Sequence, residues 1–408
     1  MNAPLPSLDL ATLDVSDEEF YRADTWHEPF ALLRREDPVH YCPESRFGPY
    51  WSVTKYNDIM AVELDHKTYS SQAGGIQVRD PKPGLETENF IRMDPPRHTI
   101  ERRTVAPIVA PFNLKNFTPT IRERTRYVLD SLPKDEEFDW VDRVSIELTT
   151  MMLATLFDFP WEERRKLTYW SDVATFTDFD APDALVRSEE ERFEELKKMA
   201  EYFRVLWDER QRQEPRFDLI SMLAHGEETR EMSLREFIGN LGLLIVGGND
   251  TTRNSMSGGL YYLSKFPEEW AKVRANPDLV PKLVAETIRY QTPVIHMRRT
   301  ALRDTELGGK RIREGDKVVM WYVSGNRDDE VIPDADKFIV DRAKPRQHLS
   351  YGAGIHRCVG DRLADLQLQI LWEEILARDL QIEVLAEPTR IKSNFIRGIR
   401  KMPAVIHT

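Results

Sequence analysis

The sequence predicts a mainly α-helical fold with a minor β component, and three observations support this prediction. Between residues 97 and 290, apolar side chains recur at the spacing of amphipathic helices. Within this region, residues 233–265 form one long helix candidate, in which Ser233 and Glu236 make a capping box at the N-terminus. Segments rich in aromatic and β-branched residues, which are typical of strands, flank the helical region on both sides. No linker interrupts the chain, so we expect all 408 residues to form a single domain.

The N-terminal part contains three predicted elements in chain order. Residues 16–36 are expected to form a helix with charges on one face. Strand signals at about 39–70, bounded by Gly48-Pro49 and Asn57-Asp58, predict a small sheet. Residues 71–92 are rich in Gly and Pro and predict a long loop, a kind of segment that is often functional.

The C-terminal part mixes strands with one helix. Strands are expected to return from about residue 300 to 338, with turns at Gly308-Gly309 and Glu314-Gly315. The β-rich part of the domain is expected to include the two ends of the region 300–408. A final amphipathic helix is expected at about 360–378.

Composition and charge exclude several classes of protein. A formal net charge of -12 argues against nucleic acid as the main partner, because a phosphate backbone needs a basic face. No run of about eighteen apolar residues is present, and the first residues do not resemble a secretory signal. The two cysteines, Cys42 and Cys358, exclude a disulfide framework. We therefore expect a cytoplasmic protein without a transmembrane segment.

The strongest local signal is the segment from Tyr351 to Gly360, which reads Tyr-Gly-Ala-Gly-Ile-His-Arg-Cys-Val-Gly. Its three glycines allow the backbone to fold tightly and to bring the sulfur of Cys358 close to a flat ligand. Because Cys358 precedes the last predicted helix, the N–H groups and dipole of that helix are expected to favour a thiolate. The alternative is a buried free cysteine that behaves as a small hydrophobe, but the glycine frame favours the ligand.

This segment resembles the cysteine-ligand loop of the cytochrome P450 family, in which an aromatic residue precedes Gly-x-Gly-x-His/Arg-x-Cys-x-Gly. The resemblance implies the cytochrome P450 fold, with haem b between the long central helix and the Cys358 loop. It also implies that the Cys358 thiolate ligates the iron and favours cleavage of the O–O bond of O₂, the co-substrate. Tyr351 departs from the usual Phe; the ring is retained, but the added hydroxyl changes the hydrogen bonding available near the sulfur.

Two further motifs stand in the order that the family requires. Glu286 and Arg289 match a buried structural pair, which an arginine of the following meander joins in the family. Asn326-Arg327-Asp328 resembles part of that region, and the joining arginine stays open. In the long helix, Gly247-Gly248-Asn249-Asp250-Thr251-Thr252 matches the oxygen groove and the acid–alcohol pair of the family. Asp250 would relay protons from solvent, and Thr251 would hydrogen-bond above the iron.

The resemblance also assigns the groups that hold the haem. The residues that match the family's propionate partners are His98, Arg102, Arg299 and His356, with His348 as a further candidate. Gly247, Tyr351 and Gly352 would contact the haem from the two sides.

Residues 247–254, 296–301 and 393–398 resemble the bacterial alkane and fatty-acid terminal hydroxylases. The expected substrate pocket consists of Ile76, Val78, Leu243, Val246, Ile295, Met297, Phe395 and Ile396. This apolar set suits a small hydrophobic linear substrate, a medium-chain n-alkane or fatty acid, although ordinary core packing is the alternative for each residue.

Three other functions stay open at this stage. A terpene or steroid substrate would keep every haem motif. A peroxide-driven enzyme is a second alternative, against which the pair Asp250-Thr251 argues. A non-catalytic haem-binding or sensor protein is the third.

Electrons are expected to come from NADH through a ferredoxin reductase and a ferredoxin, because two cysteines cannot hold an iron–sulfur cluster. The expected docking patch on this monomer consists of Arg103, Lys344, Arg346, Arg357 and Arg362. Reversing one of these charges is expected to slow reduction and to weaken its salt dependence.

Overall fold

The computed structural model describes residues 8–408, and α-helices are the main secondary structure of this part of the chain. The α-helices are α1 (Glu18–Arg22), α2 (His27–Glu36), α3 (Tyr56–Leu64), α4 (Arg97–Val105), α5 (Pro111–Asp130), α6 (Glu147–Phe157), α7 (Arg165–Thr175), α8 (Glu189–Gln211), α9 (Leu219–His225), α10 (Leu234–Lys265), α11 (Pro267–Ala275), α12 (Val280–Gln291), α13 (Tyr322–Gly325) and α14 (Asp361–Ala377). Short 3-10 turns are η1 (Leu10–Thr12), η2 (Phe90–Arg92), η3 (Ala106–Val109), η5 (Trp161–Glu163), η6 (Pro277–Leu279) and η7 (Gly354–His356), and a π-helical turn, η4 (Val141–Ile146), leads into α6.

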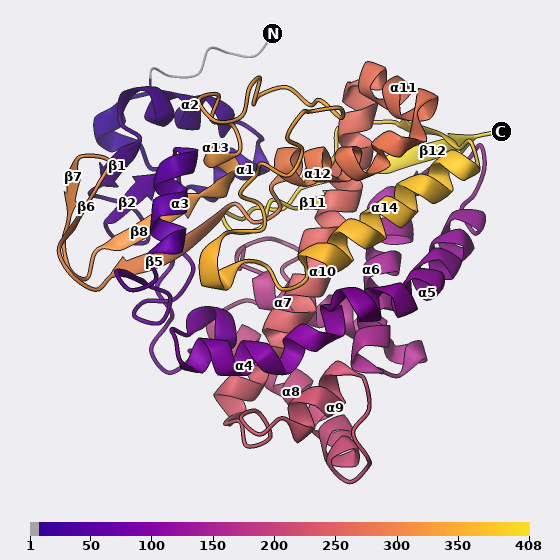
Figure 1. The fold of residues 1–408 in the computed structure, drawn as a ribbon, viewed down its shortest axis with the longest axis horizontal. Helices are drawn as coiled ribbons and strands as arrows, with labels where there is room; N and C mark the ends of the chain where they lie inside the picture. Colours follow the sequence, from indigo (N-terminus) through magenta and orange to yellow (C-terminus); the bar gives the residue numbers. More distant parts are fainter. Residues whose placement is uncertain (1–7) are drawn as a thin grey trace.

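The β component consists of one five-stranded sheet and three smaller ones. The strands are β1 (Val39–Cys42), β2 (Tyr50–Val53), β3 (Tyr69–Ser70), β4 (Phe138–Asp139), β5 (His296–Ala301), β6 (Thr305–Leu307), β7 (Lys310–Ile312), β8 (Lys317–Trp321), β9 (Gln381–Val384), β10 (Thr389–Arg390), β11 (Ile399–Lys401) and β12 (Pro403–His407). The large sheet has the order β1-β2-β8-β5-β3, in which only β2 and β8 run parallel. This sheet lies on one side of the molecule together with α1, α2, α3 and α13, and most of the other helices lie on the other side (Figure 1).

Helix α10 runs through the middle of the helical part, where α6, α7, α8, α12 and α14 all contact it (Figure 1). Its N-terminus has the predicted capping box, in which the Ser233 side chain accepts from the Glu236 N–H and the Glu236 carboxylate accepts from the Ser233 N–H. The glycines of this helix allow close packing: a Cβ on Gly239 would lie 2.0 Å from the backbone oxygen of Glu88. The loop at 71–92 therefore packs directly against α10.

Three predicted elements differ from the structure. The single helix expected over 16–36 is broken into α1 and α2, because Asp24 takes a left-handed conformation with φ 56°. The region 39–70 contains α3 between its strands, since Asn57 and Asp58 lie in the first turn of a helix instead of a turn. The strands expected up to residue 338 end at Trp321, after which α13 and an irregular segment follow.

The remaining predictions of the fold agree with the structure. The loop at 71–92 has no strand or α-helix, α14 matches the final helix, and Gly308, Gly309 and Gly315 have the positive φ angles of turns. Among residues 8–408, no helix is both long enough and apolar enough to cross a membrane.

Candidate active site

A cavity of about 420 Å³ lies beside α10, and most of the predicted site residues face it. Its wall includes Cys358 from the loop before α14, together with Gly247 and Thr251 of α10. A volume of this size is in the range of small-molecule sites. The predicted residues that line it are Ile76, Arg102, Leu243, Val246, Gly247, Thr251, Met297, Arg299, Tyr351, Gly352, His356, Cys358, Phe395 and Ile396.

The loop that carries Cys358 is closed by local backbone contacts. The Cys358 N–H donates to the Tyr351 carbonyl at 2.8 Å. Gly354 has φ +62°, and a Cβ there would lie 2.5 Å from the Glu63 carbonyl oxygen, so only glycine fits where the loop meets α3. These contacts hold the sulfur three residues before the start of α14, with its side chain exposed to the cavity.

The protonation of Cys358 depends on burial as well as on the helix terminus. Desolvation by the surrounding protein raises the pKa of the Cys358 thiol to about 11, although the Gly360 N–H, Arg102 and Arg357 act in the opposite direction. The helix terminus alone therefore does not make a thiolate at neutral pH. A bound cation reverses this balance, because a coordinating thiol is deprotonated.

Tyr351 directs its hydroxyl to helix α14. The hydroxyl donates to the Asp365 carboxylate at 2.7 Å and lies 3.2 Å from the Asp361 carbonyl. Burial, followed by the charge of Asp365, raises the pKa of Tyr351 well above its ordinary value. The hydroxyl that distinguishes this residue from Phe is thus bound by the ligand helix and keeps the aromatic ring in place.

Two histidines lie together beside the cavity, and of these only His356 lines its wall, whereas His98 does not. The rings of His98 and His356 lie 4.3 Å apart, and His356 Nε2 lies 3.1 Å from the Ser71 hydroxyl. Both ring nitrogens of His98, and Nδ1 of His356, are buried and have no hydrogen-bond partner in the described part of the chain. Burial and then Arg102 lower the pKa of His98 to about 4. Both rings are therefore neutral N–H donors at pH 7, and the arginines must supply the positive charge for two propionates.

The two arginines differ in how much of their charge is available. Arg102 donates to the Arg357 carbonyl and has no carboxylate partner within residues 8–408. Arg299 donates to the Glu63 carboxylate at 2.9 Å, and the Tyr322 hydroxyl also donates to Glu63. Sequence reasoning missed Ser71 and Glu63, since both lie far from the motifs along the chain.

His348 lies apart from this group. Its ring packs 5.5 Å from that of Tyr351, and it is absent from the cavity wall. Burial, and then the positive charge of Arg289, lower the pKa of His348 to about 3. Its ring is therefore neutral at pH 7 and cannot form an ion pair with a propionate. His348 therefore packs with Tyr351 and not with the pair of His98 and His356.

Within α10, Thr251 and Asp250 point to different surroundings. The Thr251 hydroxyl faces the cavity and donates to the Gly247 carbonyl at 2.9 Å. Asp250 is fully buried: it accepts from Ser171 at 3.0 Å and from Thr175 at 3.1 Å, and Arg253 lies 2.9 Å away. Because Thr175 lines the cavity and Asp250 does not, a proton from Asp250 has its shortest bonded route through Thr175.

The adjacent glycines of α10 have different neighbours. A Cβ on Gly247 would meet nothing within 4 Å, whereas a Cβ on Gly248 would lie 2.6 Å from Leu153. Gly247 therefore leaves room in the cavity, as expected for an oxygen groove. Gly248 also allows α6 to pack closely against α10, a reason that the sequence did not reveal.

Glu286 and Arg289 form a buried network under the Cys358 loop. The Glu286 carboxylate accepts from Arg289 at 2.7 and 2.8 Å and from Arg342 at 3.0 Å. Arg289 also donates to the carbonyls of Asn326, Ala335 and Lys337. The Asn326 side chain then donates to Ser350, beside Tyr351, so the network supports the start of the ligand loop.

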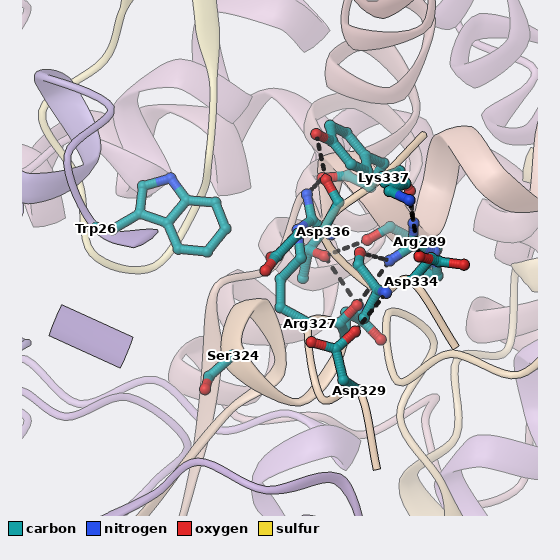
Figure 2. A network of polar contacts seen from close by, with 12 residues as sticks. Trp26, Arg289, Ser324, Arg327, Asp329, Asp334, Asp336 and Lys337 are labelled. Atoms are coloured by element: carbon teal, nitrogen blue, oxygen red, sulfur yellow. Dashed lines mark hydrogen bonds and ion pairs between the residues drawn. The ribbon is translucent and has the colours of Figure 1, made fainter. Parts of the chain in front are cut away.

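The structure identifies the arginine that the sequence left open. It is Arg342 that joins Glu286. Arg327 instead donates to the Tyr290 carbonyl at 2.9 Å and stacks over the Tyr290 ring at 3.9 Å. Figure 2 shows Arg289 of α12 among Arg327, Asp334, Asp336 and Lys337, which come from the irregular segment that follows α13.

Two predicted pocket residues lie elsewhere. Val78 and Ile295 are fully buried in the core that contains Trp321, and neither lines the cavity. Ile295, which precedes β5, packs into this core, whereas Val294 and Met297 line the cavity. Both residues therefore belong to ordinary core packing, the alternative that the sequence left open.

The residues of the predicted docking patch are all at the surface. Arg103, Lys344, Arg346, Arg357 and Arg362 are exposed. Two of them are partly neutralised, since Arg346 pairs with Asp365 and Arg357 pairs with Asp361, both at 2.9 Å.

The donor set fits a haem. A thiol in the cavity wall can ligate iron, and the unpartnered ring nitrogens of His98 and His356 would donate to propionates beside Arg102 and Arg299. The open space at Gly247 belongs to the same cavity. The individual roles of these residues stay predictions.

Comparison with known proteins supports this assignment. The family model described as Cytochrome P450 matches residues 45–394. Linalool 8-monooxygenase from Pseudomonas putida is 37% identical over 404 residues, which cover 96% of this chain and 98% of that protein. The methyl-branched lipid omega-hydroxylase from Mycobacterium tuberculosis is 30% identical, with 98% of this chain and 96% of that protein covered. Among solved structures, Cytochrome P450-153 from Novosphingobium aromaticivorans has a TM-score of 0.90 and 48% identity, over 97% of this chain and 99% of that chain.

Proposed function

The chain belongs to the cytochrome P450 family, and we propose that it is a monooxygenase that hydroxylates the terminal carbon of medium-chain n-alkanes or fatty acids. The observation that carries this proposal is the apolar wall beside Cys358, to which Leu243, Val246, Met297, Phe395 and Ile396 contribute. A hydrocarbon substrate fits such a wall because it has no polar group that would need a hydrogen-bond partner there. The similarity to a lipid omega-hydroxylase supports the same substrate class.

Haem b, held by Cys358 and by the polar groups of His98, Arg102, Arg299 and His356, would supply the activation of O₂ and the cleavage of the C–H bond. The protein's own residues do the rest. The apolar wall excludes water and orients the substrate, while Thr251 holds a hydroxyl proton at the cavity. Asp250 and Thr175 deliver protons to that side of α10.

We expect Thr251→Ala to uncouple electron use from hydroxylation. Without the hydroxyl, protons arrive at the wrong place or time, and oxygen is reduced to peroxide or water instead of entering the substrate. The product formed per NADH consumed should fall by about tenfold or more, in the range of a lost general acid. The measurement compares NADH, peroxide and alcohol in one reconstituted assay. Thr251→Ser keeps the hydroxyl and should restore coupling; a fully coupled alanine variant would remove Thr251 from the mechanism.

The electrons would come from NADH through a ferredoxin reductase and a ferredoxin. The exposed arginines around the ligand loop, Arg103 and Arg362 above all, would attract an acidic partner there. Arg103 and Arg362 have no ion-pair partner within residues 8–408.

A second candidate is the oxidation of an acyclic terpenoid. Linalool 8-monooxygenase is similar to this chain over nearly its whole length, which favours a substrate of that kind. Such a substrate shares the linear apolar shape and would also present an end of its chain to the iron.

A titration of the haem-loaded protein tests the two candidates. The ligands are n-alkanes and fatty acids of increasing chain length, with linalool, a bicyclic monoterpene and a steroid for comparison. We expect a Soret shift toward high spin that is strongest at one linear chain length, and a terminal alcohol as the product of turnover. A shift only with linalool would favour the terpenoid candidate, and a shift only with the bulky ligands would reject both.

A further inference from the structure

One part of the cavity wall is cationic. Arg79 from the loop at 71–92, Arg92 from η2 and Arg192 from α8 all contribute to it. These arginines are separate from the groups assigned to the haem. Arg92 donates to the Thr87 carbonyl and Arg192 to the Phe176 carbonyl, whereas Arg102 contacts Arg357 and His356 contacts Ser71.

Arg92 lacks an acidic partner. Its Nη1 donates to the Thr87 carbonyl at 3.1 Å, and within residues 8–408 no carboxylate lies close enough to form an ion pair with it. Burial, followed by the positive charges of Arg192 and Arg298, lowers the pKa of Arg92. An enclosed guanidinium without a counter-ion is costly, so it indicates an anion that the protein itself does not supply.

The two neighbouring arginines are only partly neutralised. Arg79 and Arg192 share the single carboxylate of Glu189, at 2.9 and 3.9 Å respectively. Arg79 Nη2 is buried and has no hydrogen-bond partner in the described chain. The Glu18 carboxylate lies 3.7 Å from this nitrogen, beyond hydrogen-bond distance, and Glu18 already pairs with Arg46 at 2.6 Å.

The other acidic side chains of the wall are engaged elsewhere. Asp80 pairs with Arg298 and Lys317, Glu86 with Arg235, and Glu63 with Arg299. The cationic part of the wall therefore keeps an excess of positive charge, while Leu243, Val246, Met297, Phe395 and Ile396 form an apolar part of the same cavity.

We propose that Arg92, assisted by Arg79 and Arg192, binds the carboxylate of a fatty acid, so that the substrate is an acid rather than an n-alkane. The proposal rests on the terminal hydroxylation proposed above and narrows its substrate class. Guanidinium groups bind carboxylates through paired, charge-assisted hydrogen bonds, and the apolar wall would receive the alkyl chain. With the carboxylate held at the arginines, the methyl end is the part left free to reach the iron.

The test compares an acid with its ester in the haem-loaded protein. Dissociation constants for dodecanoate, methyl dodecanoate and dodecane are measured from the Soret shift in the wild type, Arg92→Gln, Arg92→Lys and Arg22→Gln. Arg22 is a matched control, because it is an exposed arginine paired with Glu19, and neither of these residues lines the cavity. The wild type should bind the acid at least about tenfold more tightly than the ester, as expected for a charged hydrogen bond.

Arg92→Gln should remove this preference, by raising the dissociation constant for dodecanoate about tenfold with little change for the ester. Arg92→Lys should keep part of the preference, and Arg22→Gln all of it. Equal binding of acid and ester by the wild type would overturn the proposal, as would a variant that weakens both ligands equally. Loss of haem in Arg92→Gln would also overturn it, because the carboxylate bound there would then be a haem propionate.

The outcomes for the wild type separate this proposal from the one on which it rests. Terminal hydroxylation of dodecane and of the ester, without any preference for the acid, rejects the carboxylate site alone. Failure of all three linear ligands to bind or react rejects terminal hydroxylation of linear chains and the carboxylate site together.

Discussion

Replacing Cys358 by serine is expected to reduce monooxygenase activity to the background of the assay. A serine hydroxyl is a harder and weaker ligand than a thiolate, so it does not push electron density toward oxygen and does not favour cleavage of the O–O bond. The side chain lies in the cavity wall, and its loop is held by the Tyr351 carbonyl and by Gly354, so serine changes the ligand atom without disturbing the backbone. Turnover reports the loss of activity. The absorption spectrum of the reduced, carbon monoxide-bound protein reports the change of the iron ligand.

Cys42→Ser provides the matched control. Cys42 is the other cysteine of the chain, and it is buried in strand β1 and does not line the cavity. We expect this variant to keep its spectrum and its activity, with a small loss of stability from placing a hydroxyl in the core. An active Cys358→Ser variant with an unchanged spectrum would exclude Cys358 as the iron ligand.

Local signals in the sequence predicted much of the fold. The capping box at Ser233, the glycines of the ligand loop and the final helix all depend on residues close together in the chain, and the structure agrees with them. The prediction of a mainly α fold with minor β structure, in the cytochrome P450 family, is confirmed. The break at Asp24 was missed because one left-handed residue ends a helix without changing the hydrophobic pattern on either side.

Contacts between residues far apart along the chain could not be predicted from the sequence. The pattern at Glu286 and Arg289 indicates a pair, but the partner Arg342 reaches it only through the folding of the irregular segment between them. Similarly, Ile295 and Met297 are two residues apart and equally apolar, and only the placement of β5 decides which one meets the cavity. The cationic wall around Arg92 combines three separate segments, so no local motif could have indicated it.

The second large effect is expected for Glu286→Gln. The Glu286 side chain is fully buried and accepts from Arg289, from Arg342 and from the Ile339 N–H. Glutamine has nearly the same size but no charge, so it leaves two enclosed guanidinium groups without a counter-ion. Removing one partner of a buried ion pair costs about 3–5 kcal/mol, and we expect a loss of this size in the free energy of unfolding of the haem-loaded protein.

The matched control is Glu194→Gln, which removes a carboxylate from an exposed pair with Lys197 in α8. Its cost should stay below about 1 kcal/mol, since exposed pairs contribute little. Urea unfolding followed by far-ultraviolet circular dichroism compares the two variants. If Glu286→Gln does not accumulate as folded protein, the yield of haem-loaded protein relative to the control gives the same comparison. Equal stability of both variants would contradict a structural role for the buried network.

The same network predicts how stability depends on pH. Burial alone would raise the pKa of Glu286, but the hydrogen bonds and charges of Arg289 and Arg342 outweigh burial and hold the pKa below its usual value. A carboxyl group whose pKa is lower in the folded state stabilises the protein above the pKa of the unfolded chain, about 4.3, and this contribution is lost as the pH falls toward the folded-state pKa. The wild type should therefore lose stability in acid more steeply than Glu286→Gln, measured as the free energy of unfolding between about pH 6 and pH 3. Parallel curves for the two proteins would show that Glu286 does not titrate with unfolding, and so would place the acid sensitivity in other carboxylates.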